Sequence, residues 1–307
     1  MNFYECKVFD SRYGILVVGG TEDFMEKKLK QIIQNSDNGL LKQFLEEQYP
    51  VDVALILEEL DEEVLKDFIA LANNQQLSEI LREAGPKLQR KMMQIIIIHR
   101  AIDLFYFMPN DDVVDILGTL HVDVRKQYLN LMRNSEREEV QKMLAYDAHT
   151  AGGLMTTEFI TFKAQLTVGQ TLEELRKISP NTEVIDILFI TNQENTVIGW
   201  INIRDLFIHE AEMELNELMN SHLITVTTEV DQEEVARLTA KYDLSVVPVV
   251  NHRKVILGII TIDDIIDVLQ EEYQEDMLRM GGVQESEEIG GPFLDFLKKR
   301  LPWLLIN

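Results

Sequence analysis

The sequence predicts an α + α/β chain: an all-helical, superhelical (solenoid-like) N-terminal domain is followed by a duplicated α/β module and a connecting helix. Up to Met143, apolar residues recur at helical spacing in short blocks, and beyond Gly153 the pattern changes to strands and helices that occur twice. A chain of 307 residues also exceeds the roughly 100–200 residues of a single domain. We expect an unassigned extension over 1–24, domains over 25–150, 151–212 and 213–275, and a connecting helix over 276–307.

The helical domain is predicted from blocks of apolar residues that are each only about two to three turns long. Examples of these blocks are Val53–Leu60, Val64–Leu71 and Val113–Leu120. Helices this short are marginal in isolation, so they must stack on their neighbours, which gives a solenoid-like domain. Met92, Met93 and His99 are expected to pack inside it.

The α/β module is predicted to be duplicated because two stretches of the chain match each other. Leu154-Met155-Thr156 corresponds to Leu218-Met219-Asn220, and Gly199-x-Ile201-x-x-x-Asp205-Leu206 corresponds to Gly258-x-Ile260-x-x-x-Asp264-Ile265. In the second copy, the runs Val246–Val250 and Ile256–Ile260 are almost continuously apolar, which is typical of strands covered on both faces. Each copy is therefore expected to follow the order strand, helix, strand, strand, helix.

The end of the chain has the pattern of a membrane boundary. The basic run Lys298–Arg300 precedes Leu301–Ile306, an apolar run that contains Trp303. Basic, then aromatic and apolar residues are typical of the cytoplasmic edge of a transmembrane helix. We therefore expect the connecting helix to lead into a transmembrane helix that is missing here, and the alternative is an amphipathic helix packed on the protein's own core. Elsewhere, apolar runs such as Ile95–Ile98 fall far short of the roughly 20 residues of a span, so the chain as given is predicted to be soluble.

Composition restricts the class of partner. The formal net charge of −24 argues against a nucleic-acid-binding protein, because phosphate backbones are bound by clustered Lys and Arg, and it favours cations. The hydrophobic fraction of 46% is ordinary for a globular protein, so the acidic residues are expected on folded surfaces. Cys6, the single cysteine, cannot form an intrachain disulfide, and residues 1–20 lack the apolar core of a signal peptide, so secretion is not expected. A reducing compartment is therefore expected.

The duplicated module resembles a tandem pair of cystathionine-β-synthase (CBS) domains, which sense nucleotides and ions. The second copy carries the fuller signature, Gly258-x-x-Thr261-x-x-Asp264. A carboxylate at the start of a helix can bind ribose hydroxyls, while a Thr hydroxyl and free backbone N–H groups can face phosphate, so Thr261 and Asp264 are candidate nucleotide ligands. In the first copy Asn202 replaces the Thr ahead of Asp205. The competing interpretation is that Thr261 and Asp264 only cap the helix.

Taken together, the chain resembles the MgtE family of magnesium transporters. The resemblance is carried by the order of an acidic helical domain, Ala151-Gly152-Gly153-Leu154-Met155-Thr156, and a CBS pair that contains Asp231–Leu238 and ends in Thr261-x-Asp263-Asp264-x-x-Asp267-Val268-Leu269. It implies a homodimer formed through the CBS domains, on the cytoplasmic face of the cell membrane, with a plug-type connecting helix that joins it to a transmembrane pore domain. It further implies Mg²⁺, and ATP or another adenine nucleotide, as ligands.

The resemblance also implies which carboxylates bind Mg²⁺, so that the pore closes when the ion bridges acidic faces of the helical and CBS domains. Carried over position by position, the candidate metal ligands are Glu79, Asp111, Asp115, Asp231, Glu233, Asp243, Asp264, Asp267, Glu272 and Glu275.

The chemistry of one predicted helix, residues 262–276, agrees with cation binding. Its acidic residues Asp264, Asp267, Glu271 and Glu275 fall on one stripe, and its apolar residues Ile262, Ile266, Leu269 and Tyr273 fall on the opposite stripe. Like charges at this spacing destabilise a helix by roughly 0.2–0.5 kcal/mol per pair, and a bound cation would reverse that effect. Ligand sets of oxygen atoms favour Mg²⁺ or Ca²⁺, and the chain contains no EF-hand loop pattern.

Other interpretations remain open at this point. Asp111 and Asp115 on their own are typical of a helix start, where acidic side chains interact with the positive end of the helix dipole. A stand-alone CBS protein that senses adenine nucleotides is the second functional hypothesis. An enzyme with a regulatory CBS pair is the third, although no nucleophile elbow, phosphate-binding loop or metal-hydrolase motif is present in the sequence. We therefore expect a protein that is not an enzyme.

Overall fold

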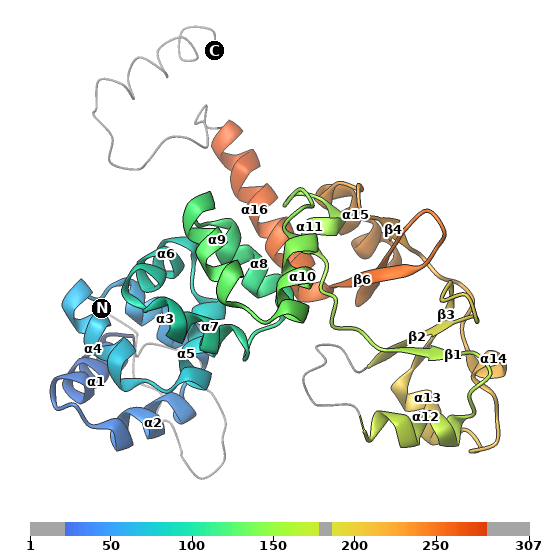
Figure 1. Ribbon diagram of the computed structural model, residues 1–307, viewed down its shortest axis with the longest axis horizontal. Helices are drawn as coiled ribbons and strands as arrows, with labels where there is room; N and C mark the ends of the chain where they lie inside the picture. Colours follow the sequence, from blue (N-terminus) through green and yellow to red (C-terminus); the bar gives the residue numbers. More distant parts are fainter. Residues whose placement is uncertain (1–21, 178–185, 281–307) are drawn as a thin grey trace, which may run out of the picture. The chain divides into compact units, whose positions relative to one another are not determined.

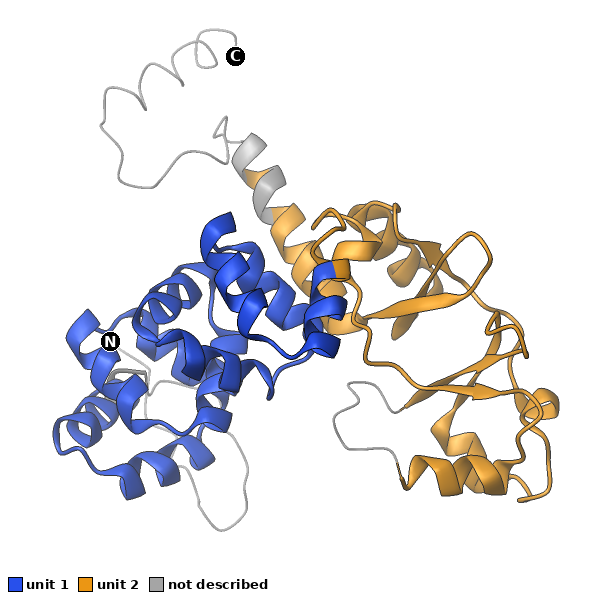
Figure 2. Ribbon diagram, viewed as in Figure 1, with its two compact units in different colours: residues 1–141 blue, residues 142–307 orange. Residues whose placement is uncertain are grey.

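The chain divides into two compact units, residues 1–141 and 142–307 (Figure 2). The computed structural model describes residues 22–177 and 186–280 of the chain (Figure 1). In its described part the first unit is entirely helical, and the second alternates strands and helices, so the predicted fold class is confirmed. The predicted extension over 1–24 and most of the predicted connecting helix lie outside the described residues.

The first unit consists of short helices of the predicted kind. Their bounds are α1 (Glu22–Gln34), α2 (Asn38–Glu47), α3 (Pro50–Glu58), α4 (Glu62–Leu71), α5 (Asn74–Glu83), α6 (Pro86–Ile95), α7 (Ile98–Phe105), α8 (Asn110–Gly118), α9 (Val122–Leu131) and α10 (Asn134–Met143). Helices α3, α5, α7 and α9 pack one on the next, and α4, α6 and α8 form a second series. This nearest-neighbour stacking is typical of a solenoid-like domain.

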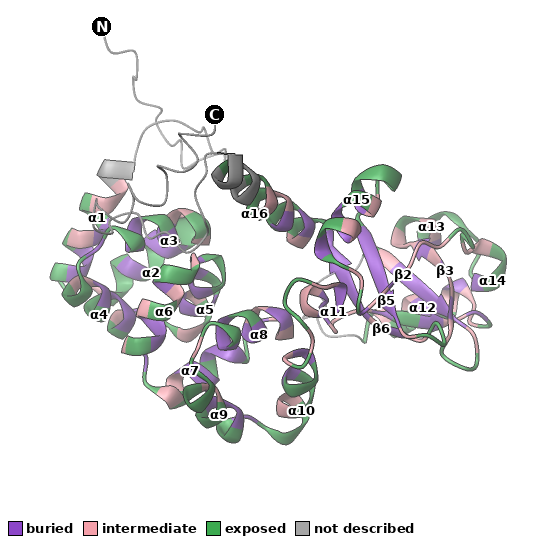
Figure 3. Cartoon of the chain, turned by 90° about the horizontal axis from the view of Figure 1, so that it is seen from above, coloured by how far each residue is buried: buried purple, intermediate pink, exposed green. Residues whose placement is uncertain are grey.

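Stacking buries one side of each short helix (Figure 3). Leu57, Leu65 and Phe68 are fully buried, and so is Met92, which with Met93 confirms the predicted core methionines. The prediction for His99 was wrong, because His99 is exposed. At about 100° per residue, His99 lies on the side of α7 opposite to its buried residues.

Side chains satisfy some of the helix ends in this unit, where backbone groups lack a partner within the helix. Asp37 accepts hydrogen bonds from the first turn of α2, and Asn73 does the same for α5. At the other ends, basic side chains donate to the last carbonyl groups: Arg100 donates to the carbonyl oxygens of Ile69 (2.5 Å) and Ala72 (2.6 Å) after α4. Burial lowers the pKa of Arg100, in keeping with its enclosed position.

The second unit contains the predicted duplication. The first copy consists of β1 (Thr161–Lys163), α12 (Val168–Leu175), β2 (Ile187–Thr191), β3 (Val197–Asn202) and α13 (Ile203–Ile208). The second consists of β4 (Val226–Thr227), α15 (Gln232–Tyr242), β5 (Val246–Val250), β6 (Ile256–Thr261) and α16 (Ile262–Met280). One-turn helices, α11 (Ala151–Leu154) and α14 (Leu215–Leu218), precede the copies. In each three-stranded sheet the first pair is parallel and the second antiparallel.

Both faces of each sheet are covered, which explains the apolar runs of the strands. In the first copy Leu188 and Ile190 face the core under α12 and α13, whereas Phe189 between them faces the other way. There Phe189 packs in one cluster with Val246 and Val250 of the second copy. The two sheets therefore pack against each other, with helices on their outer faces.

The copies also exchange the segments that precede them. Thr156, ahead of the first copy, pairs through its backbone with Ile259 of β6, and Asn220, ahead of the second, pairs with Trp200 of β3. Glycine is required at both contacts, because a Cβ on Gly258 would lie 2.6 Å from the Thr156 carbonyl oxygen. Each copy therefore depends on a segment that belongs, in sequence, to the other.

Helix α16 packs on its own copy through a face other than the apolar stripe described from the sequence. Ile265 and Val268 are buried in the core of the second copy. Ile262 and Ile266 of the predicted apolar stripe are 41% and 47% exposed, because that stripe points about a quarter turn away from the sheet. None of the helices within 22–177 and 186–280 has the length and apolar character needed to cross a bilayer.

Candidate functional site

The candidate ligands of the helical unit lie on two helices. Glu79 is exposed on α5, where its carboxylate accepts a hydrogen bond from the Gln75 side chain (3.2 Å). Asp111 lies in the first turn of α8 and is only 8% exposed, and Asp115 lies one turn later and is exposed. The position of Asp111 matches the helix-start interpretation, while Asp115 presents its carboxylate to solvent.

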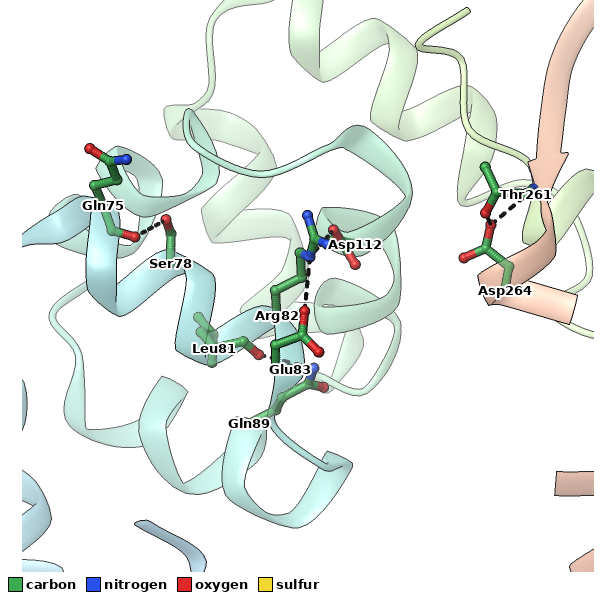
Figure 4. Close-up of polar contacts among 9 residues, drawn as sticks. All are labelled: Gln75, Ser78, Leu81, Arg82, Glu83, Gln89, Asp112, Thr261 and Asp264. Carbon is green, nitrogen blue, oxygen red and sulfur yellow. Dashed lines mark hydrogen bonds and ion pairs between the residues drawn. The ribbon is translucent and has the colours of Figure 1, made fainter. Parts of the chain in front are cut away.

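A basic residue that the sequence argument did not use lies beside this acidic surface. Arg82, in the last turn of α5, places its Nε 3.6 Å from Asp112 Oδ2 of α8 and 3.5 Å from Glu83 Oε1 (Figure 4). Asp112 follows Asp111 directly in the sequence. Only the packing of the helices could reveal that Arg82 reaches α8.

Two candidate ligands of the second CBS copy, Asp231 and Glu233, lie at the start of α15, and a third, Glu272, is bonded to the residue between them. Asp231 is the N-cap, and its Oδ1 accepts the backbone N–H of Glu233 (2.9 Å). Gln232 between them is only 6% exposed and donates from Nε2 to Glu272 Oε1 of α16 (2.8 Å). The structure thus links the start of α15, which carries Asp231 and Glu233, to Glu272 of α16 through Gln232, a residue that sequence reasoning missed.

A further carboxylate, also absent from the predicted set, lies just ahead of α15. The hydroxyl of Thr228 donates to Glu229 Oε1 (2.7 Å). Hydrogen bonds from the side chains of Thr228 and then Thr227 lower the pKa of Glu229, which favours its ionised form. Glu229 therefore adds negative charge two residues before Asp231.

Asp243 lies apart from this group. It is the C-cap of α15, in the left-handed conformation (φ 51°), whereas Asp231 caps the start of the same helix. Asp243 follows Asp231 by 12 positions, which corresponds to about 18 Å along the helix axis. Asp243 and Asp231 therefore cannot bind the same ion within one chain.

The Thr261 and Asp264 pair caps α16. The backbone N–H of Thr261 donates to Asp264 Oδ2 (3.2 Å), and its hydroxyl donates to the same oxygen (Figure 4). Thr261 is 3% exposed, so this bond satisfies a buried hydroxyl. Asp267 is exposed one turn further along α16, and the side chain of Glu275 lies outside the described residues.

The first copy is built differently at the equivalent place. Asn202 caps α13, and its Oδ1 accepts from the backbone N–H and the Nε of Arg204 (both 3.0 Å). The first copy therefore presents an arginine where the second presents Asp263. The two copies share a scaffold but offer opposite charge at this corner.

The donor chemistry of the candidate ligands fits a hydrated hard cation. All of the candidates are carboxylates, which suit Mg²⁺ or Ca²⁺. Within the described ranges no three His, Cys, Asp or Glu side chains are arranged as a metal-binding group.

Comparison with known proteins agrees with the two units. The family model described as the MgtE intracellular N domain matches residues 48–149, and that of the CBS domain matches residues 151–212 and 215–271. The chain is 30% identical over 291 residues to a protein of Thermus thermophilus named Magnesium transporter MgtE, and it is 28% identical over 262 residues to a protein of the same name in Bacillus subtilis. These alignments cover 93% and 85% of this chain, but only 64% and 58% of the relatives' length.

A solved structure gives the same result for the fold. The crystal structure of the cytosolic domain of the Mg²⁺ channel MgtE in complex with ATP matches 79% of this chain and 99% of its own chain, with 30% identity and a TM-score of 0.75. The helical unit, the duplicated α/β module and their order in the sequence are thus common to both. The chain belongs to the MgtE family and comprises its intracellular N domain and a tandem pair of CBS domains.

Proposed function

We propose that this chain is the cytosolic Mg²⁺-sensing region of a magnesium transporter, placed at the cytoplasmic face of the membrane next to a transmembrane pore domain. The observation that carries the proposal is the match of the chain to nearly the whole cytosolic domain of a Mg²⁺ channel. Relatives that bear the name magnesium transporter extend beyond the part matched here, which leaves room for a pore domain.

The proposed mechanism is electrostatic. Both units carry exposed candidate carboxylates, such as Asp115 in the helical unit and Asp231 and Glu233 in the CBS pair. In a chain with a net charge of −24, such surfaces repel each other, and a divalent ion between them replaces repulsion with attraction. When Mg²⁺ is plentiful, the two units draw together and the connecting helix passes the change to the pore, which closes.

We propose a nucleotide of the ATP class as a second ligand of the CBS pair. Support comes from the similar channel domain, which was solved in complex with ATP, and from the match of Thr261 and Asp264 to the CBS signature. Because Asp264 is already bonded to Thr261, a ribose at this corner would have to share or replace that bond. A stand-alone nucleotide sensor would respond to ATP without any response to Mg²⁺, which separates the two hypotheses.

We also propose that two copies associate through the CBS pair. Ile262, Ile266 and Tyr273 form one exposed stripe along α16, and Tyr273 is 67% exposed. Phe207, the first-copy counterpart of Ile266, is 72% exposed on α13. Such apolar surface fits a second copy, and two-fold symmetric dimers are the commonest homo-oligomers. A monomeric mass by light scattering at high concentration, with and without Mg²⁺, would contradict this proposal.

The sensing proposal can be tested by neutralising Asp111 and Asp115 together with asparagine. The radius of gyration of the variant and of the wild type is measured by small-angle X-ray scattering across a Mg²⁺ titration at constant ionic strength, which holds screening fixed. The double variant should be more compact than the wild type in chelator, because repulsion is lower. It should be less compact than the wild type in saturating Mg²⁺, because two ligands are lost.

A matched control comes from α4. Glu63 and Asp67 are exposed acidic residues of the helical unit with the same spacing of four, and they are not candidate ligands. The Glu63→Gln/Asp67→Asn variant should give a curve parallel to that of the wild type. If the Asp111/Asp115 variant also ran parallel to the wild type, these residues would be ordinary solvated acids, and a wild type that ignores Mg²⁺ would refute the sensor.

A further inference from the structure

One arginine reaches the acidic surface that we assign to Mg²⁺ in the helical unit. Arg82 of α5 lies one turn after the candidate ligand Glu79, and its Nε is 3.6 Å from Asp112 Oδ2 (Figure 4). Asp112 stands on α8 between the candidate ligands Asp111 and Asp115. Arg82 therefore connects the two helices that carry the three candidate ligands of this unit.

Helix α8 has no positive charge of its own. Its sequence, NDDVVDILG, contains three aspartates and no lysine or arginine. Arg82, supplied by another helix, thus brings a positive charge to the run of acids on α8. A guanidinium at this distance reduces the negative potential that a free cation would meet at Asp111 and Asp115.

The contact has the properties of a replaceable ion pair. The distance of 3.6 Å is longer than a normal N–H···O hydrogen bond, and the two side chains are 44% and 27% exposed. Exposed pairs of this kind contribute little to stability. Arginine is also a weakly hydrated cation on a flexible stem, so it can move away from Asp112 without exposing a buried charge.

We propose that Arg82 is a tethered counter-ion that competes with Mg²⁺ for the acidic surface of α8 and thereby sets the Mg²⁺ concentration at which that surface fills. The inference rests on the proposed sensing function. At low Mg²⁺, Arg82 partly neutralises the acids on α8. At high Mg²⁺, the divalent ion displaces the monovalent guanidinium, which still has Glu83 beside it at 3.5 Å.

The test compares charge removal at Arg82 with charge removal elsewhere on the same unit. Arg82→Gln removes the charge, Arg82→Lys retains it, and Arg90→Gln removes one charge from an exposed residue of α6. For each variant, the MgCl₂ concentration at which the full 307-residue chain reaches half of its compaction, called the half-point, is measured at constant ionic strength. Arg82→Gln should lower the half-point by about threefold to tenfold, whereas the other two variants should stay within about twofold of the wild type.

The direction in which the half-point shifts shows whether Arg82 competes with Mg²⁺ or helps the carboxylates to bind it. A half-point that rises in Arg82→Gln would mean that Arg82 holds the acids in place, and equal shifts in Arg82→Gln and Arg90→Gln would reflect net charge alone. Either result, or no shift at all, would overturn the inference about Arg82. The proposed sensing function would still hold in these cases, because the wild type would still respond to Mg²⁺. A wild type that shows no response to Mg²⁺ would overturn both.

Discussion

The helical unit and the CBS pair differ in the range of the contacts that stabilise them. In the helical unit each short helix packs on the next few along the chain, as α3 does on α5 and α5 on α7. In the CBS pair, Thr156 is bonded to Ile259 and Trp200 to Asn220, so segments from opposite copies complete each other's sheets. A destabilising substitution should therefore affect only the neighbouring helices in the first unit, whereas in the second unit it should lower the stability of both copies.

The largest effect is expected on the free energy of unfolding of the CBS pair, whose two copies should unfold together. Leu215 is fully buried in the core of the first CBS copy although it belongs to the segment ahead of the second copy, and Leu88 is 1% exposed in the helical unit. Leu215→Ala should cost about 2–5 kcal/mol of unfolding free energy and weaken both copies together. Urea unfolding followed by the fluorescence of Trp200, in a Trp303→Phe background, measures the effect on the CBS pair.

Leu88→Ala provides the matched control. It should lower the stability seen by far-ultraviolet circular dichroism, which reports on the helices, and leave the Trp200 transition nearly unchanged. If Leu88→Ala moved the Trp200 transition as far as Leu215→Ala does, the two units would unfold as one, and the distinction between local and exchanged contacts would have no energetic meaning.

The exchange of segments marks the limit of what periodicity could predict about the fold. The type and order of the elements followed from local patterns, such as the apolar runs at Val246–Val250 and Ile256–Ile260, which form β5 and β6. No local pattern says that Thr156 pairs with the second copy rather than the first. The prediction that His99 is packed inside was wrong for a related reason, because an isoleucine run beside a residue does not show which side of the helix faces the core.

The candidate site shows the same limit. The sequence could place Asp111 and Asp115 on one helix, but the contact of Arg82 with α8 joins residues from different helices. Likewise, Gln232 looked like an ordinary polar residue, yet it is buried and bonded to Glu272, 40 positions away. The resemblance to the MgtE family therefore supplied the candidate carboxylates, and tertiary packing decides which groups bond to them or neutralise them.

A smaller effect is expected from the residues that contact the candidate carboxylates, which differ between the two units. In the helical unit a charge, Arg82, lies beside the acids, whereas in the CBS pair a neutral amide, Gln232, bonds to Glu272. Gln232→Met keeps the length of the side chain and removes the donor. The half-point for Mg²⁺ should rise about threefold, equivalent to roughly 0.7 kcal/mol, because Glu272 is no longer held in place. Isothermal titration with MgCl₂ measures the half-point.

Gln170→Met is the control in the first copy. The Gln170 side chain accepts the backbone N–H of Thr167 in the capping box of α12 (3.0 Å), and Gln170 is not near any candidate ligand in the sequence. Gln170→Met should lower the free energy of unfolding about as much as Gln232→Met does, but it should leave the half-point for Mg²⁺ unchanged. A half-point that stays constant in Gln232→Met would show that Glu272 needs no support from α15.

The smallest effect concerns a half-buried carboxylate with one buried oxygen atom in the last helix of the helical unit. Among the described residues, Glu136 Oε2 is buried without a hydrogen-bond partner, and Arg133 Nη1 lies 4.0 Å from the other oxygen, Oε1. Burial raises the pKa of Glu136, with Arg133 opposing the rise and Glu139 adding to it. The folded state therefore binds this proton more tightly than the unfolded state, and the free energy of unfolding falls as pH rises from the ordinary value of 4.5 through the raised pKa.

Glu136→Gln removes that ionisation while keeping the shape of the side chain. At neutral pH it should therefore stabilise the helical unit, by about 0.5 kcal/mol because the group is partly solvated and near Arg133. The gain should shrink as pH falls and vanish below the ordinary glutamate pKa, where Glu136 is protonated in both states. Glu138→Gln, an exposed neighbour on α10, should give no such pH-dependent difference from the wild type. Urea unfolding by circular dichroism across this pH range measures both, and a gain for Glu136→Gln that is equal at all pH values would show that burial of the charge is not its cause.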